Sequence, residues 1–247
     1  MIFNKKHILA AFFCILDFTI YADPIPEWFL PLRDAVYEQK LKADEVVPLY
    51  REVKRRAEES LSGQGLYLML SRCEYMMGRV YLYDARKDEA WKDDALARFE
   101  EGMVQARRSL DIAASSPAWV MLAENLSQSC SIQSVGYVMR YGLDVERYAK
   151  NALALDPGNT AAQILMASRW VYAPSPFNNL KRGIQMMEDI LNNFDTRLQK
   201  DDRFNVCSAI GYAYLQQKNT KEARLWLQRS LSVYPSNQYV QELLSEI

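Results

Sequence analysis

The spacing of small residues in the segment 203–240 constrains the fold more than any other feature of the sequence. Gly211 lies twelve residues before Ala223, and Pro235 lies twelve residues after Ala223. Apolar residues around them recur at intervals of three and four, which is typical of two amphipathic helices. Antiparallel helices approach closely only where Gly or Ala occupies their crossing, and proline ends the second helix. The segment therefore predicts a tight helical hairpin.

A similar pattern recurs upstream and indicates an array of repeats. Pro157 and Pro235 are 78 residues apart, ten more than two periods of 34 residues. Two insertions account for the ten, one around 173–176 and one in the linker 192–200. The residues that define the predicted repeats are Gly78, Tyr81, Ala152, Pro157, Ala167, Gly183, Gly211, Tyr214, Ala223 and Pro235.

We therefore predict an all-α fold of antiparallel helix pairs that stack as a solenoid of about three to four repeats. The clearest repeats are expected at 126–159, at 160–203 with its insertions, and at 204–237. The copy around Gly78 is degenerate, and a capping helix that begins at Ser236 is expected to end the chain. Residues 23–247 are expected to form one domain.

The register from Gly211 to Pro235 resembles the tetratricopeptide repeat (TPR) without a gap. The sequence departs from that family's Trp, aromatic residue and Ala at Cys207, Leu227 and Ser230. The insertion WVYAPSPFNN at 170–179 is similar to a loop in secreted bacterial repeat proteins. These include the T-component of tripartite periplasmic (TRAP) transporters, a helical protein that partners a substrate-binding protein. The resemblance implies a helical solenoid that binds other proteins.

Residues 1–22 have the pattern of a secretory signal peptide. Lys5 and Lys6 form a basic start, residues 8–16 form a short apolar run, and cleavage is expected between Ala22 and Asp23. This run is well below the roughly 20 residues that a membrane-spanning helix needs, although an uncleaved anchor stays open as the alternative. We therefore predict an exported protein, periplasmic or extracellular, without a transmembrane helix in the mature chain.

The composition of the mature chain excludes several classes of function. Without Lys5, Lys6 and Asp17, Lys+Arg falls from 30 to 28 and Asp+Glu from 31 to 30, which leaves a net charge near −2. This balance provides no basic footprint for nucleic acid. The only histidine, His7, lies in the signal, so His-dependent nucleophile systems and His-ligated metal sites are excluded. We predict no enzymatic activity and no cofactor.

Three pairs of neighbouring acids could suggest glycosidase-type chemistry. They are Asp93/Asp94, Glu100/Glu101 and Asp201/Asp202. No base, nucleophile or oxyanion arrangement accompanies them in the sequence. We interpret all three pairs as solvated charges on helix faces or in turns.

Three cysteines, Cys73, Cys130 and Cys207, remain after cleavage. An odd number cannot pair completely within one chain, and no two form a CxxC unit. We interpret them as free thiols that pack as small apolar groups. A disulfide between Cys73 and Cys130 stays open, because exported proteins meet an oxidising environment.

The candidate binding residues lie on the first helix of each predicted pair, which lines the concave side of a solenoid. Arg, Tyr, Asn and Gln side chains there suit an extended peptide or a carboxylate. An ordinary solvated helix face is the alternative for the arginines. The lysine and asparagine set of chaperone-binding TPR proteins is not reproduced. The candidates are Arg72, Tyr75, Arg79, Tyr83, Ser168, Tyr172, Asn205, Tyr212 and Gln216.

The leading hypothesis is a non-catalytic extracytoplasmic scaffold that binds another protein or peptide of the cell envelope. The alternative is an accessory subunit of a periplasmic solute-uptake system, similar to the T-component. Such a subunit would bind a small apolar ligand together with a substrate-binding protein.

Overall fold

The computed structural model describes residues 25–86 and 88–247, and the expected signal peptide lies outside the described residues. Within those two ranges the chain forms eleven α-helices and three short 3-10 helices, with no strand. The predicted all-α class is therefore confirmed. Over the same residues, no helix is both long enough and apolar enough to span a bilayer.

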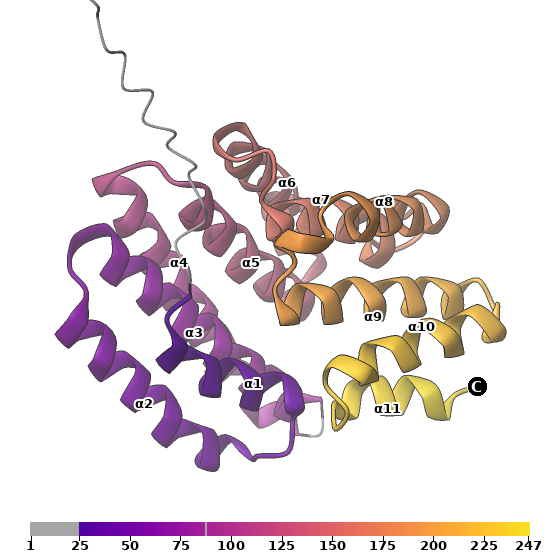
Figure 1. Cartoon of the computed structure of the whole chain (residues 1–247), viewed down its shortest axis with the longest axis horizontal. Helices are drawn as coiled ribbons and strands as arrows, with labels where there is room; N and C mark the ends of the chain where they lie inside the picture. The colour runs from indigo at the N-terminus through magenta and orange to yellow at the C-terminus, as the bar shows by residue number, and fades with distance from the viewer. Residues whose placement is uncertain (1–24, 87) are drawn as a thin grey trace, which may run out of the picture.

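The helices follow one another with short connections (Figure 1). The α-helices are α1 (Leu30–Glu38), α2 (Ala43–Ser60), α3 (Gly63–Ala85), α4 (Lys92–Ile112), α5 (Ser116–Ile132), α6 (Val135–Leu155), α7 (Thr160–Tyr172), α8 (Leu180–Asn193), α9 (Lys200–Gln216), α10 (Thr220–Val233) and α11 (Gln238–Ser245). The 3-10 helices are η1 (Glu27–Phe29), η2 (Glu89–Trp91) and η3 (Asp195–Arg197).

Neighbouring helices pack in pairs from α3 onward. The pairs are α3 with α4, α5 with α6, α7 with α8, and α9 with α10, and α11 packs against α10. The first helix of each pair also contacts the first helix of the next, so α3, α5, α7 and α9 form a continuous succession. This succession positions the candidate site, because side chains from all four helices face one shared space.

Two glycines lie at close approaches between paired helices. A Cβ atom added at Gly211 would lie 2.7 Å from Leu227 Cδ2 and 3.1 Å from the Leu227 backbone nitrogen. A Cβ added at Gly78 would lie 2.5 Å from Phe99 Cε1. Both distances are shorter than a normal carbon contact, so only glycine fits these crossings. The prediction that small residues mark helix crossings is confirmed at both positions.

A buried carboxylate joins α2, α3 and α4. Glu74 is fully buried and accepts hydrogen bonds from Tyr50 Oη at 2.6 Å, Lys54 Nζ at 2.8 Å and Arg98 Nη1 at 3.2 Å. Burial, followed by the hydrogen bond to Glu74, raises the pKa of Tyr50 to about 12. A charge in the interior is tolerated only when it is paired in this way, so the network fixes how the first three long helices meet.

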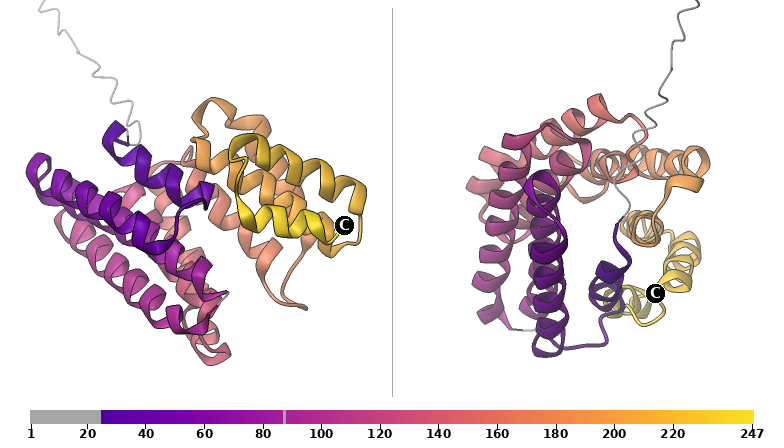
Figure 2. Two further views of the ribbon diagram at one scale, coloured as in Figure 1. Left: turned by 90° about the horizontal axis from the view of Figure 1, so that it is seen from below. Right: turned by 60° about the vertical axis from the view of Figure 1, so that its left-hand side comes forward.

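The two ends of the helical array contact each other (Figure 2). The Tyr37 ring of α1 stacks on the Tyr234 ring with centroids 5.0 Å apart, and both side chains are buried. Asn237 Nδ2 donates to the Tyr37 carbonyl at 2.7 Å, and Ser236 Oγ donates to the Glu38 carbonyl at 2.8 Å. The array therefore curves until its first helix meets its last helices.

Some helix boundaries differ from the sequence-based expectation. The helix pair that ends at Leu155 begins at Ser116, so the expected repeat start at 126 falls inside α5. The last helix is capped by Asn237, whose Oδ1 accepts from Val240 N at 3.1 Å. The expected cap, Ser236, instead directs its hydroxyl to α1, because that contact closes the array.

The three cysteines of the described chain are free thiols. Cys73 and Cys207 are buried, and Cys130 is half-buried. The interpretation as small packed groups is confirmed, and the open alternative of a Cys73–Cys130 disulfide does not hold in this structure. Burial raises the pKa of the Cys207 thiol, which keeps it protonated and unreactive.

Candidate functional site

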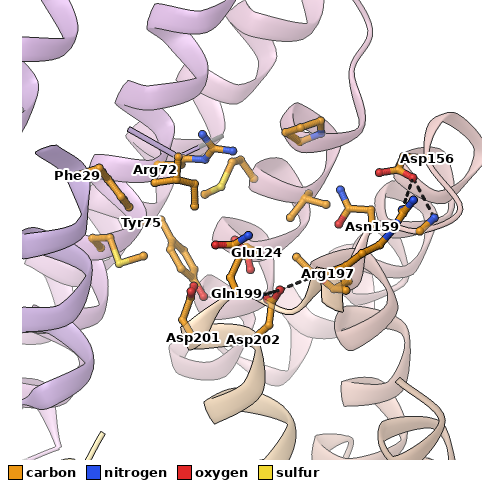
Figure 3. A pocket seen from close by; sticks show the side chains of 18 of the residues that line it. Phe29, Arg72, Tyr75, Glu124, Asp156, Asn159, Arg197, Gln199, Asp201 and Asp202 are labelled. Carbon is orange, nitrogen blue, oxygen red and sulfur yellow. Dashed lines mark hydrogen bonds and ion pairs between the residues drawn. The ribbon is translucent and has the colours of Figure 1, made fainter. Parts of the chain in front are cut away.

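A cavity of about 300 Å³ lies between α3, α5, α7 and α9 (Figure 3). This volume is at the lower end of the range of about 300–1,000 Å³ that is usual for ligand pockets. One part of its wall is apolar and includes Phe29, Met76, Val120 and Met121. Another part is polar and comes from the N-terminal turns of α7 and α9, from Glu124 of α5 and from Arg72 of α3.

Capping interactions hold the polar part of the wall in place. Asn159 caps α7 by accepting from Ala162 N at 3.0 Å. Gln199 is the N-cap of α9, and Asp202 closes a capping box by accepting from Gln199 N at 3.2 Å. Thr160 Oγ1 also donates to Asp202 at 2.6 Å, which ties the start of α7 to the start of α9. These helix ends are therefore satisfied by the protein's own side chains.

Two ion pairs neutralise charges at the edges of the cavity. Arg33 Nη1 lies 3.5 Å from Asp201 Oδ1, and Arg197 Nη1 lies 3.5 Å from Asp156 Oδ1. Asp156 also accepts from Gly158 N at 2.9 Å. Both arginines thus have an acidic partner within the protein.

Glu124 of α5 points into the cavity near Asp201 and Asp202 (Figure 3). Glu124 is half-buried and lines the cavity. Burial, followed by the negative charges of Asp201 and Asp202, raises the pKa of Glu124 to about 8. Arg79 and Arg72 oppose this shift. Across residues 25–86 and 88–247, no hydrogen bond or ion pair reaches the Glu124 carboxyl.

The two aspartates of α9 are also perturbed. Burial, followed by the charge of Asp201, raises the pKa of Asp202 to about 6, although the hydrogen bond from Thr160 lowers it. Burial raises the pKa of Asp201 as well, with Arg33 as the main opposing charge. Glu124, Asp201 and Asp202 therefore form a cluster of acids with raised pKa values that faces one cavity.

Two of the predicted groove residues, Arg72 and Tyr75, line this cavity. Arg79 lies one further turn along the same face of α3. Its guanidinium carbon is 4.2 Å from the centre of the Tyr37 ring and 5.7 Å from that of Tyr75. The predicted arginine and tyrosine stripe of α3 is therefore turned toward the interior of the curve.

Further predicted residues lie on the inner side without lining the cavity. The rings of Tyr172 and Tyr212 contact each other with centroids 5.2 Å apart. Asn205 Nδ2 donates to the Tyr37 hydroxyl at 3.0 Å, so this side chain belongs to the contact between α9 and α1.

The remaining three candidates lie away from the cavity. The Tyr83 hydroxyl donates to Gln238 of α11 and so takes part in closing the array. Ser168 is half-buried on α7, and Gln216 is exposed at the end of α9. The structure thus brings together Arg72, Tyr75 and Arg79 and disperses the others.

The interpretation of Asp201 and Asp202 as solvated acids is wrong. Asp202 is only 7% exposed, because its carboxylate accepts from Gln199 N in the capping box of α9 and from Thr160. The other acidic pairs, Asp93/Asp94 and Glu100/Glu101, are exposed as expected.

Sequence reasoning missed Glu124 altogether. A signal was present, since Glu124 is the only charged residue in SPAWVMLAENLSQSCSI, the sequence of α5. A single acid in an otherwise uncharged helix needs either a buried partner or a polar cavity.

Within the described chain, no group of three or more His, Cys, Asp or Glu side chains is arranged to hold a metal ion. A comparison with models of known protein families found no match. None of the curated proteins that were compared matches the sequence either.

Proposed function

We propose that the protein is a TPR-like, non-enzymatic binding module that acts outside the cytoplasm and receives a segment of a partner protein on its inner face. The observation that carries the proposal is the cavity whose wall comes from four consecutive first helices, α3, α5, α7 and α9. Helical-repeat proteins use this concave side for binding, because each repeat contributes one helix to it.

The pairing of the helices supports the TPR-like description. Gly211 and Gly78 occupy close crossings in two different pairs, and Gly183 lies in a third, where an added Cβ would be 2.6 Å from Val171 Cγ2. Small residues at equivalent crossings are what a repeated helix pair requires.

Binding is a better account of the cavity than catalysis. Its polar groups are engaged as helix caps and ion pairs, which fix the shape of the wall. The thiols of the described chain lie outside the cavity wall. A rigid wall with one unpartnered carboxyl suits recognition of a ligand group.

The alternative, an accessory subunit that holds a small ligand, draws on the size of the cavity. A volume of about 300 Å³ accommodates a small molecule or one or two side chains. The charged part of the wall favours a polar ligand over the apolar ligand that the sequence suggested.

Site-specific photo-cross-linking tests the proposal. A photoreactive phenylalanine analogue at Tyr172 would report on the inner side, where that ring contacts Tyr212. The same analogue at Leu225, an exposed position on α10, is the matched control. We expect one protein partner to cross-link at residue 172 and not at residue 225 in cells that make the protein. Native mass spectrometry of the purified protein separates the alternative: a retained small molecule without a cross-linked partner would refute the scaffold.

A further inference from the structure

The Glu124 carboxyl is the one acid of the cavity wall without a partner in the described chain. Asp201 is paired with Arg33, Asp156 with Arg197, and Asp202 accepts two hydrogen bonds. Glu124 is half-buried and faces the cavity, so its carboxyl is available to a ligand. An unpartnered carboxyl in a cavity is a candidate for ligand recognition.

The groups around Glu124 select the charge of that ligand. The two nearest acids are Asp201 and Asp202 of α9, and the nearest cations on α3 are Arg72 and Arg79. Arg79 is occupied by the rings of Tyr37 and Tyr75. The residues that line the cavity include four acids, Glu124, Asp156, Asp201 and Asp202, and two arginines, Arg72 and Arg197. The acids outnumber the arginines, so the wall favours a cation over an anion.

Helix N-termini at the cavity do not change this selection. Backbone N–H groups at the start of a helix attract anions. Here the Asn159 side chain already accepts from the first turn of α7, and a capping box between Gln199 and Asp202 occupies the start of α9. An incoming anion would therefore have to displace a built-in cap.

The apolar part of the wall suits a hydrocarbon chain. Phe29, Met76 and Met121 are buried and line the cavity together with the acids. Methionine and aromatic side chains pack against methylene groups and adapt to their shape. The Tyr75 ring, which also lines the cavity, can contact a cation with its face.

We propose that the cavity binds an ammonium or guanidinium group carried on a short aliphatic chain, with Glu124 as its counter-ion. This inference rests on the proposed binding function and names the chemistry that the site recognises. The same chemistry can come from a Lys or Arg side chain of a partner protein or from a free aliphatic amine.

Binding of the cation is coupled to release of one proton. At neutral pH the empty site holds Glu124 mainly as the neutral acid, since its pKa is about 8. The ammonium ion enters with its own charge, the Glu124 O–H bond breaks, and the proton leaves to solvent. The product is an ammonium–carboxylate pair. Because only the ionised form pairs with the ligand, affinity should rise about tenfold between pH 7 and pH 9.

The other groups that face Glu124 do not mask this dependence. Arg72 and Arg79 of α3 and Arg33 of α1 stay charged over the whole range. Tyr37 and Tyr75 have pKa values raised by burial, so they stay neutral. Asp202, with a pKa of about 6, is mainly ionised from pH 7 upward, and burial also raises the pKa of Asp201.

Calorimetry on the purified protein tests the proposal directly. The probes are Nα-acetyl-lysine N-methylamide, which carries a capped lysine side chain, and 1,5-diaminopentane, a free amine. The norleucine analogue of the first probe is the neutral control, and propionate is the anionic control. Titrations at pH 7 in two buffers with different ionisation enthalpies count the released protons. We expect an amine to bind with release of nearly one proton and the two controls not to bind.

Two variants test whether Glu124 is the residue that binds the amine. Glu124→Gln keeps the size of the side chain and removes its charge, so we expect at least a tenfold loss of affinity and a flat pH profile. Glu58→Gln changes an exposed glutamate of α2 and serves as the matched control, with no expected effect. Circular dichroism confirms that each variant is folded, and the proton count in the unaltered protein needs no variant.

The outcomes separate this inference from the function on which it rests. Binding of the capped lysine points to a protein ligand, and binding of the diamine alone points to a free amine. Preferential binding of propionate, binding of Ca²⁺ without either amine, or an unchanged affinity in Glu124→Gln would overturn the inference. If a partner still cross-links at residue 172 while no amine binds, the binding function stands and the cationic specificity is wrong. If amines bind as expected and no partner cross-links, the scaffold function is wrong.

Discussion

Replacement of Gly211 by valine tests the tightest helix crossing of the C-terminal pair. An added Cβ would lie 2.7 Å from Leu227 Cδ2 and Cγ and 3.1 Å from the Leu227 backbone nitrogen. Leu227 is fully buried, so its side chain has no free space to enter, and the backbone nitrogen cannot yield without moving α10. The substitution therefore forces α9 and α10 apart.

The magnitude follows from two opposing contributions. Overpacking of a well-packed interior costs about 1–3 kcal/mol, and the contact with backbone places this case at the upper end. Valine has a helix propensity only a few tenths of a kcal/mol better than glycine, which offsets little of the cost. We expect a loss of about 3 kcal/mol in the free energy of unfolding. For a domain of this size that corresponds to a melting temperature lower by roughly 6–12 °C.

Thermal and urea unfolding followed by circular dichroism measure the effect. Gly65→Val is the matched control, because an added Cβ at Gly65 in the first turn of α3 meets no atom within 4 Å. We expect that variant to stay within about 0.5 kcal/mol of the unaltered protein. Adding Leu227→Ala to Gly211→Val should recover part of the loss, since the small side chain makes room for valine. A Gly211→Val protein as stable as the control would refute the close crossing.

Three further variants test other parts of the structure. The pKa of Glu124 is raised to about 8, so the folded state binds this proton more tightly than the unfolded state does. The stability that the protonated carboxyl contributes is complete below the ordinary pKa of glutamate and is lost as pH rises toward 8. Glu124→Gln should therefore gain stability over the unaltered protein between pH 5 and pH 8, by as much as about 3 kcal/mol, in urea unfolding at each pH; equal pH profiles would contradict this. Asn237→Ala removes both a cap and the bond to the Tyr37 carbonyl, so we expect a loss of about 2 kcal/mol by the same method, against no change for the exposed Ser232→Ala. Glu74→Gln leaves two cations without their buried partner and should cost about 3 kcal/mol; a neutral effect would show that the network adds nothing.

The sequence carried enough information to predict the helical hairpins. Gly211, Ala223 and Pro235 follow one another at fixed intervals because a helix crossing and a turn both have local requirements. The inner position of Arg72 and Tyr75 followed from the same periodicity, since residues three apart share a helix face. These features depend on neighbours within one or two helices.

The closure of the array and the acidic cavity could not be predicted in this way. Tyr37 and Tyr234 meet across almost the whole chain, and no local pattern specifies how the small rotations between helix pairs accumulate. Asp202 was interpreted as solvated because an acid in the first turn of a helix is usually exposed. Only the approach of α7, with Thr160, buries it. The raised pKa of Glu124 depends in part on the charges of Asp201 and Asp202 on α9, which are distant in sequence.

The contact between α1 and the last helices has a consequence for how the chain can change in evolution. An array with two free ends grows or shrinks by whole repeats, because each unit interacts only with its neighbours. Here Asn237 and Tyr37 must meet at 2.7 Å between donor and acceptor, so an additional helix pair would push the ends past each other. The contact between the two ends of the array therefore fixes the number of helix pairs. Neither end can unfold locally without first breaking that contact. Duplication of a repeat is readily tolerated in open arrays. In this protein it would break the contact between α1 and the last helices and change the shape of the cavity.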